Sequence, residues 1–117
     1  MIVRKKPRET MRKCLFQGKG DVLIEILFRE EEFSTPVRLC ARIVLEPGQH
    51  IGLHQHTGED ELFYVISGRG LVDDGENPQG VVPGDSILTR SGETHSLLNP
   101  GEEDLVVLAV IPQSPAS

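Results

Sequence analysis

Short runs of apolar or alternating residues, separated by turn-forming glycines and prolines, repeat along the whole chain. Pro-Gly pairs and Asp74-Gly75 supply the turn signals between these runs. No run has a helical period, and at most a short helix or turn is expected near residues 6–13. We expect strands over residues 21–28, 37–45, 61–66, 70–73, 80–82, 86–89, 95–98 and 104–111. Short strands at this spacing predict one all-β domain, either a sandwich or a barrel.

The alternation within single strands bears on assembly. In residues 37–45, Arg38 and Arg42 lie opposite an apolar face, so this strand should have one face in water. Residues 61–66 and 104–111 are instead apolar on both faces. Because a small barrel has only one interior, the second apolar face needs another cover. We therefore expect a homodimer.

Length and composition set the broad class. A chain of 117 residues fits one domain, and 38% hydrophobic with 26% charged residues is ordinary for a soluble protein. No apolar run is long enough to cross a membrane, and the basic start is not followed by the apolar core of a secretory signal. Cys14 and Cys40 lack metal-type spacing, which favours reduced thiols. We expect a cytoplasmic protein with no membrane partner.

Charge is distributed unevenly along the chain. The net charge is −6, but residues 1–13 carry six basic residues against Glu9, or +5, which leaves −11 for the remainder. An acidic body argues against nucleic acid as the main partner. The basic arm is a solvated terminal segment, or it contacts a phosphate, a partner or the acidic body. We expect an N-terminal arm or first strand region over 1–15, a barrel over 16–112 and a short tail over 113–117.

Residues 48–68 contain three of the four histidines of the chain. His54 and His56 are two residues apart, so on a strand both imidazoles point to one face. Glu61 follows after a tight connection, and the three side chains can converge on a metal ion. An exposed histidine pair is the simpler alternative. Glu59 is the main rival to Glu61, since a shift in strand register would exchange them.

The remaining part of the site is expected in residues 84–99, which contain the last histidine, His95. Three imidazoles and one carboxylate suit divalent transition metals such as Fe, Mn, Ni, Co, Cu or Zn, and are too rich in nitrogen for Ca²⁺ or Mg²⁺. In a six-coordinate ion, four protein ligands leave two positions for water or for a bidentate substrate.

The spacing of these residues resembles the cupin superfamily. Gly48, five residues, His54-x-His56, four residues, Glu61, six residues and Gly68 match the first cupin motif. The second motif is matched, at its usual spacing, by Gly84, Gly92, His95 and Asn99. One position departs from the pattern, because Arg90 stands where proline is usual. The chain is most similar to small single-domain microbial cupins of the oxalate-decarboxylase-like and germin-like kind.

This resemblance implies a double-stranded β-helix, or jelly-roll barrel, around one divalent metal, Mn, Fe, Ni or Zn. The ligands would be the residues that match the family pattern, His54, His56, Glu61 and His95. The first functional hypothesis is a metal-dependent enzyme, a dioxygenase, decarboxylase or isomerase, acting on a small polar or carboxylate-bearing molecule. The alternative is a non-catalytic module that uses the metal to bind a sugar or organic acid. A purely structural metal is a third interpretation.

Three further residues have two interpretations each. His50 has the strand parity of His54 and would either enter the pocket or be merely exposed. Phe63 shares the face of Glu61 and would line the pocket, or it would simply belong to the core or to an interface. Arg90 would bind an anionic substrate or be a solvated arginine in a turn. No spare acid is clearly placed as a proton donor, which weakens the hypothesis of oxalate decarboxylation.

Overall fold

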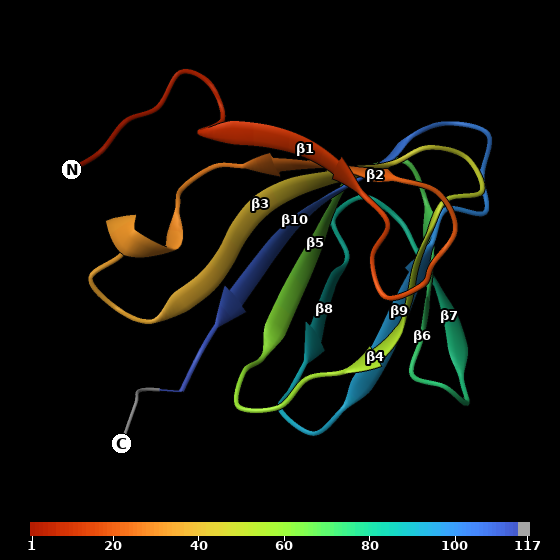
Figure 1. Cartoon of the computed structure of the whole chain (residues 1–117). Helices are drawn as coiled ribbons and strands as arrows, with labels where there is room; N and C mark the ends of the chain where they lie inside the picture. Colours follow the sequence, from red (N-terminus) through yellow and green to blue (C-terminus); the bar gives the residue numbers. More distant parts are fainter. Residues whose placement is uncertain (115–117) are drawn as a thin grey trace.

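The computed structural model describes residues 1–114, which fold into two antiparallel sheets around one core (Figure 1). One sheet has the order β1-β2-β3-β10-β5-β8, and the other has the order β4-β9-β6-β7. The elements are β1 (Glu9–Lys13), β2 (Val22–Ile26), the 3₁₀ turn η1 (Glu30–Glu32), β3 (Val37–Leu45), β4 (His50–Gln55), β5 (Glu61–Ser67), β6 (Gly70–Asp73), β7 (Pro78–Val81), β8 (Ser86–Thr89), β9 (Thr94–Leu98) and β10 (Leu105–Pro112).

Strand alternation builds the core between the sheets. In β3, Ala41 and Ile43 are buried, while Arg42 points away and pairs with Glu25 of β2. The same alternation in β10 and β5 turns every second side chain toward the opposite sheet. The buried apolar cluster consists of Val22, Ile24, Ala41, Ile43, Leu45, Ile51, Phe63, Val65, Val81, Leu97, Leu105, Val107 and Ala109. The all-β, jelly-roll prediction is thus confirmed, and residues 1–114 contain no α-helix.

The helix or turn expected near residues 6–13 is wrong from residue 9 onward, where β1 pairs with β2. All five β1 residues are exposed, so the strand is held by its backbone hydrogen bonds to β2 and shows no apolar alternation in the sequence.

The return strand of the Asp74-Gly75 hairpin begins at Pro78. Because β7 is the edge strand of its sheet, the missing N–H of this proline is tolerated.

The outer face of the six-stranded sheet carries exposed apolar side chains. Tyr64 and Ile66 of β5 are 43% and 46% exposed, and Leu88 of the neighbouring β8 is 59% exposed. This is part of the second apolar face expected from the sequence. The homodimer that would cover it stays a prediction. In the described part of the chain, no helix is long and apolar enough to span a bilayer.

Candidate metal centre

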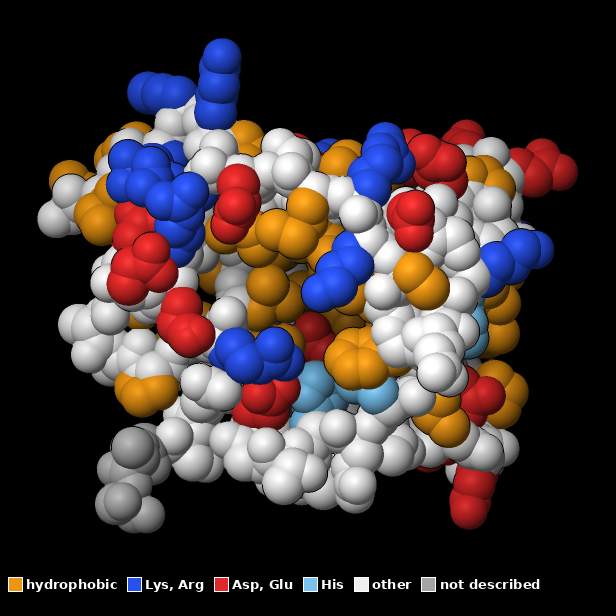
Figure 2. All heavy atoms as spheres, viewed as in Figure 1, with side chains coloured by type: hydrophobic (Ala, Val, Ile, Leu, Met, Phe, Trp, Pro, Cys, Tyr) orange, Lys and Arg blue, Asp and Glu red, His pale blue; other side chains and the backbone are white. Residues whose placement is uncertain are grey.

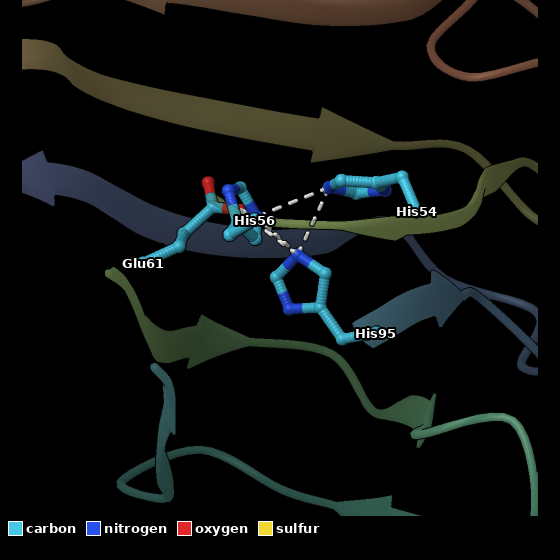
Figure 3. A group of neighbouring side chains, drawn as sticks. All are labelled: His54, His56, Glu61 and His95. Carbon is cyan, nitrogen blue, oxygen red and sulfur yellow. Dashed lines mark hydrogen bonds and ion pairs between the residues drawn. The ribbon is translucent and has the colours of Figure 1, made fainter. Parts of the chain in front are cut away.

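Four side chains from three strands meet at one point between the sheets (Figure 3). His54 lies in β4, His56 directly follows it, Glu61 begins β5, and His95 lies in β9 opposite His54. The three Nε2 atoms are 3.0–3.2 Å apart, and Glu61 Oε1 is 3.0 Å from Nε2 of both His56 and His95. The structure therefore groups the four residues that the sequence indicated as ligands.

The spacing of these atoms fits a six-coordinate cation. For a metal–nitrogen distance of about 2.1 Å, adjacent corners of an octahedron lie about 3.0 Å apart, opposite corners about 4.2 Å apart, and tetrahedral corners about 3.4 Å apart. Five of the six ligand-atom pairs lie 3.0–3.2 Å apart. The sixth pair, His54 with Glu61, lies within 4.8 Å. The five short separations match adjacent corners of an octahedron, and the limit on the sixth pair is compatible with opposite corners for His54 and Glu61.

Two of the histidines are oriented by neutral oxygen atoms. His54 Nδ1 lies 2.7 Å from the carbonyl oxygen of Gly52, and His95 Nδ1 lies 2.8 Å from the hydroxyl of Thr89. A carbonyl oxygen can only accept, so Nδ1 of His54 carries the proton and its Nε2 lone pair faces the centre. Burial lowers the pKa of His54, and the adjacent imidazoles lower it further. The neutral ring is the form that binds a metal.

The third histidine is held by a carboxylate. His56 Nδ1 donates to Glu59 over 2.8 Å, and Arg38 donates to the same carboxylate through Nε and Nη2 over 2.8 and 2.7 Å. These bonds, chiefly those from Arg38, lower the pKa of Glu59 from 4.5 to about 2. Of the two rival acids, Glu61 lies against Nε2 of His56 within the grouped side chains, and Glu59 lies against Nδ1 on the other side of the ring. Sequence reasoning missed this role.

A bulge in β4 corrects the prediction made for His50. Ile51 pairs with Leu97 and His54 pairs with His95, so two β4 residues face one residue of β9. Ile51 and His54, three residues apart, therefore both face the interior. The strand parity that linked His50 to His54 does not hold across the extra residue, and His50 is not among the residues that line the pocket.

Three of the four grouped side chains, His54, His56 and Glu61, line an open pocket of about 300 Å³. Figure 2 shows histidine and acidic side chains at the base of a hollow with hydrophobic walls. Phe63 lines this pocket, as expected, and its ring stacks on His95 with centroids 5.1 Å apart. Two basic residues, Lys13 and Arg38, also line it. The lining is otherwise apolar: Met11, Leu15, Phe16, Ile24, Ile26, Leu39, Ile43, Ile51 and Ile111.

Arg90 does not join this group. Its guanidinium pairs with Glu93 over 3.2 Å at a turn, its side chain is 70% exposed, and it does not line the pocket. The geometry is that of the solvated turn arginine, the simpler of the two interpretations. A substrate-binding role for Arg90 has no structural support.

The family of this protein is shown by a match that covers both the fold and the grouped side chains. The model of the cupin domain family matches residues 41–111, and the chain belongs to this family. The matched segment contains all four grouped residues, including His54 and His95, which are cross-strand partners in the paired strands β4 and β9.

Two similarities concern Thermotoga maritima. The chain is 43% identical over 94 residues to an oxalate-binding protein, covering 80% of this chain and 78% of the relative. It is also similar to the crystal structure of a predicted oxalate decarboxylase, with a TM-score of 0.87, 38% identity, and coverage of 97% and 100%. A putative sugar phosphate isomerase from Acidithiobacillus ferrooxidans shares the fold, with a TM-score of 0.76, 24% identity, and coverage of 91% and 69%.

Proposed function

We propose that this protein binds one divalent transition metal and uses it to hold a small dicarboxylate of the oxalate type. The observation that carries the proposal is the set of near-octahedral separations among His54, His56, Glu61 and His95, the first three of which line the pocket. Without a cation or shared protons between them, three imidazole lone pairs and a carboxylate at these distances would repel one another. Mn, Fe, Ni and Zn all suit such a nitrogen and oxygen donor set.

The pocket supports a small anionic ligand. If His54 and Glu61 held opposite corners of an octahedral ion, the two remaining positions would be adjacent and would suit chelation through two oxygens. Lys13 and Arg38 are among the residues that line the same pocket, and because the Arg38 guanidinium pairs with Glu59, it is the positive charge of Lys13 that favours negative charge on the ligand. About 300 Å³ of largely apolar space admits a compact molecule. The similarity to a protein named for binding oxalate supports this ligand class.

Binding without turnover is the form of the proposal that the geometry favours. Decarboxylation and isomerisation need a group that gives or takes a proton beside the substrate. Among the described residues that line the pocket, Glu61 is the only carboxylic acid, and it belongs to the ligand set. Glu59 is ionised and occupied by Arg38 and His56. The metal-dependent enzyme is the second candidate, and the same experiment distinguishes it.

The test uses protein purified without an affinity tag. Elemental analysis should find about one transition metal per chain, the stoichiometry of a single four-ligand site. Metal-free protein reconstituted with Mn, Fe, Ni or Zn is then titrated with oxalate by calorimetry, while oxygen uptake and carbon dioxide release are followed. We expect saturable oxalate binding that requires the metal, and no turnover. Turnover with any metal would establish the enzyme instead.

Variants of the ligand set provide the control. Loss of stoichiometric metal is expected in His54→Ala and in His95→Ala, and oxalate binding should be lost with it. Metal retained at full occupancy by either variant would overturn the site. Equal oxalate affinity with and without metal would overturn the proposed role of the metal in binding.

A further inference from the structure

The loop between β1 and β2, residues 14–21, lies against the bulge of β4 in unusually close contact (Figure 1). Lys19 and His50 exchange backbone hydrogen bonds of 3.0 and 2.9 Å. A Cβ atom added to Gly18 would stand 1.9 Å from the carbonyl oxygen of His50, and one added to Gly52 would stand 1.9 Å from that of Phe16. Only glycine at both positions allows the two backbones to approach this closely.

The bulge supplies the polar groups that hold this loop. Gly52 lies in the bulge, and its N–H donates to the carbonyl of Leu15 in the loop over 3.1 Å. Its carbonyl accepts the bond from His54 Nδ1. One peptide segment thus fixes both the loop and the imidazole of His54.

The loop carries Phe16 onto the face of that imidazole. The two rings are nearly parallel, with centroids 3.6 Å apart and planes inclined by 8°. Phe16 and Gln17 have φ angles of 53° and 56°, in the left-handed region that side chains other than glycine rarely adopt. Backbone strain of this kind persists where the surroundings enforce it, and it concentrates at functional sites.

His54 is the ligand residue that most needs such support. Of the four, it alone is not buried, whereas His56, Glu61 and His95 are. The buried Phe63 covers His95, but the residue Phe16 is itself 52% exposed. Core burial therefore does not account for a large apolar side chain held in a strained conformation at this place.

We propose that Phe16 is a positioning residue that holds the His54 imidazole in its ligating orientation and shields that side of the metal. The inference rests on the proposed metal site and adds a residue outside the matched family segment. Without the ring, His54 can turn about its side-chain bonds and water reaches the metal from the pocket side. Metal should then dissociate faster.

The experiment measures metal affinity by competition with a chelator, and dissociation by rapid mixing with excess chelator. Phe16→Ala should weaken affinity about tenfold, the lower end of the range seen for residues that orient ligands, mainly through faster dissociation. Phe16→Tyr keeps the stacked ring and should behave like the wild type. The visible spectrum of the Co(II)-loaded protein should change in Phe16→Ala and be restored in Phe16→Tyr, which a purely structural role would not produce.

Two control variants separate the ring from its surroundings. Gln17→Gly relieves neighbouring strain but keeps the ring, and Phe33→Ala removes a ring that packs on Phe28 away from the site. Both should bind metal like the wild type. If Phe16→Ala does not fold, Phe16→Leu keeps apolar volume without stacking and serves instead. Affinity and dissociation rate within twofold of wild type in the folded variant would overturn the inference, whereas a wild type without metal would refute the proposed function.

Discussion

Replacing Glu59 by glutamine tests how far the residue behind His56 supports the metal centre. The carboxylate accepts one bond from His56 Nδ1 and two from Arg38, all between 2.7 and 2.8 Å. The Glu59→Gln amide keeps a single oxygen and presents an NH₂ group to one of these donors. At least one charge-assisted bond is therefore lost, and two donors are left facing each other.

The magnitude follows from the bonds that are lost. A hydrogen bond to a charged group contributes about 1.5–3 kcal/mol, and the Glu59 side chain is 11% exposed, so solvent screens it little. We expect metal-free Glu59→Gln protein to lose about 2 kcal/mol of unfolding free energy at neutral pH. Metal affinity should fall by about tenfold to a hundredfold, because the His56 ring is then less firmly oriented and less basic.

Denaturant unfolding of the metal-free protein and chelator competition measure the two effects separately. Asp60→Asn is the matched control, because Asp60 lies in the same turn but accepts the backbone N–H of Ser91 through Oδ1, which the Asp60→Asn amide oxygen can still do. The control should leave metal affinity unchanged. If Glu59→Gln binds metal as tightly as Asp60→Asn does, the hydrogen bond to His56 does not orient the ligand, and the reasoning fails.

Three other outcomes are expected. Gly52→Ala places a Cβ 1.9 Å from the carbonyl oxygen of Phe16, so it should lower the unfolding free energy by about 1–3 kcal/mol, and an unchanged denaturation midpoint would contradict this. The backbone N–H of Arg29, together with the guanidinium of Arg4, lowers the pKa of Glu32 from 4.5 to about 2, so the contribution of Glu32 to stability is present above pH 4.5 and is lost as pH falls toward 2. Acid titration of metal-free Glu32→Gln should show a smaller loss over that interval than the wild type. Light scattering should give the mass of a dimer for the wild type and that of a monomer for Tyr64→Glu. A monomer mass for the wild type at micromolar concentration would refute the predicted homodimer.

The fold and the four grouped residues could be predicted from the sequence because their signals are local. Strand alternation in residues 37–45 and 104–111 reports directly which side chains are buried. The spacing between His54 and Glu61 covers one strand end, one turn and the next strand start, so a few residues determine where these side chains point. Adding His95 to the group required one assumption, that its strand pairs with the strand of His54, and these two strands do pair.

The residues that contact the ligand histidines, Glu59 and Phe16, could not be predicted from the sequence, because their positions depend on how distant segments of the chain meet. Which acid of the 59–61 triplet meets His56 Nδ1 and which meets Nε2 depends on the path of the turn and on Arg38, which is 21 residues away from Glu59. Phe16 reaches His54 from a loop whose only sequence signals are glycines. β1 leaves no pattern because neither of its faces is buried. The bulge reversed the parity argument for His50, because one extra residue exchanges the faces of a strand.

The bulge in β4 also means that the centre depends on chain length as well as on side-chain identity. Deleting one residue between Ile51 and His54 would restore a regular ladder with β9 and return the carbonyl of Gly52 to interstrand bonding. All four ligand residues would still be encoded, yet His54 would have lost the acceptor that selects its tautomer. A homologue with such a deletion would keep the ligand signature and bind metal poorly, so alignment gaps here carry as much information as substitutions.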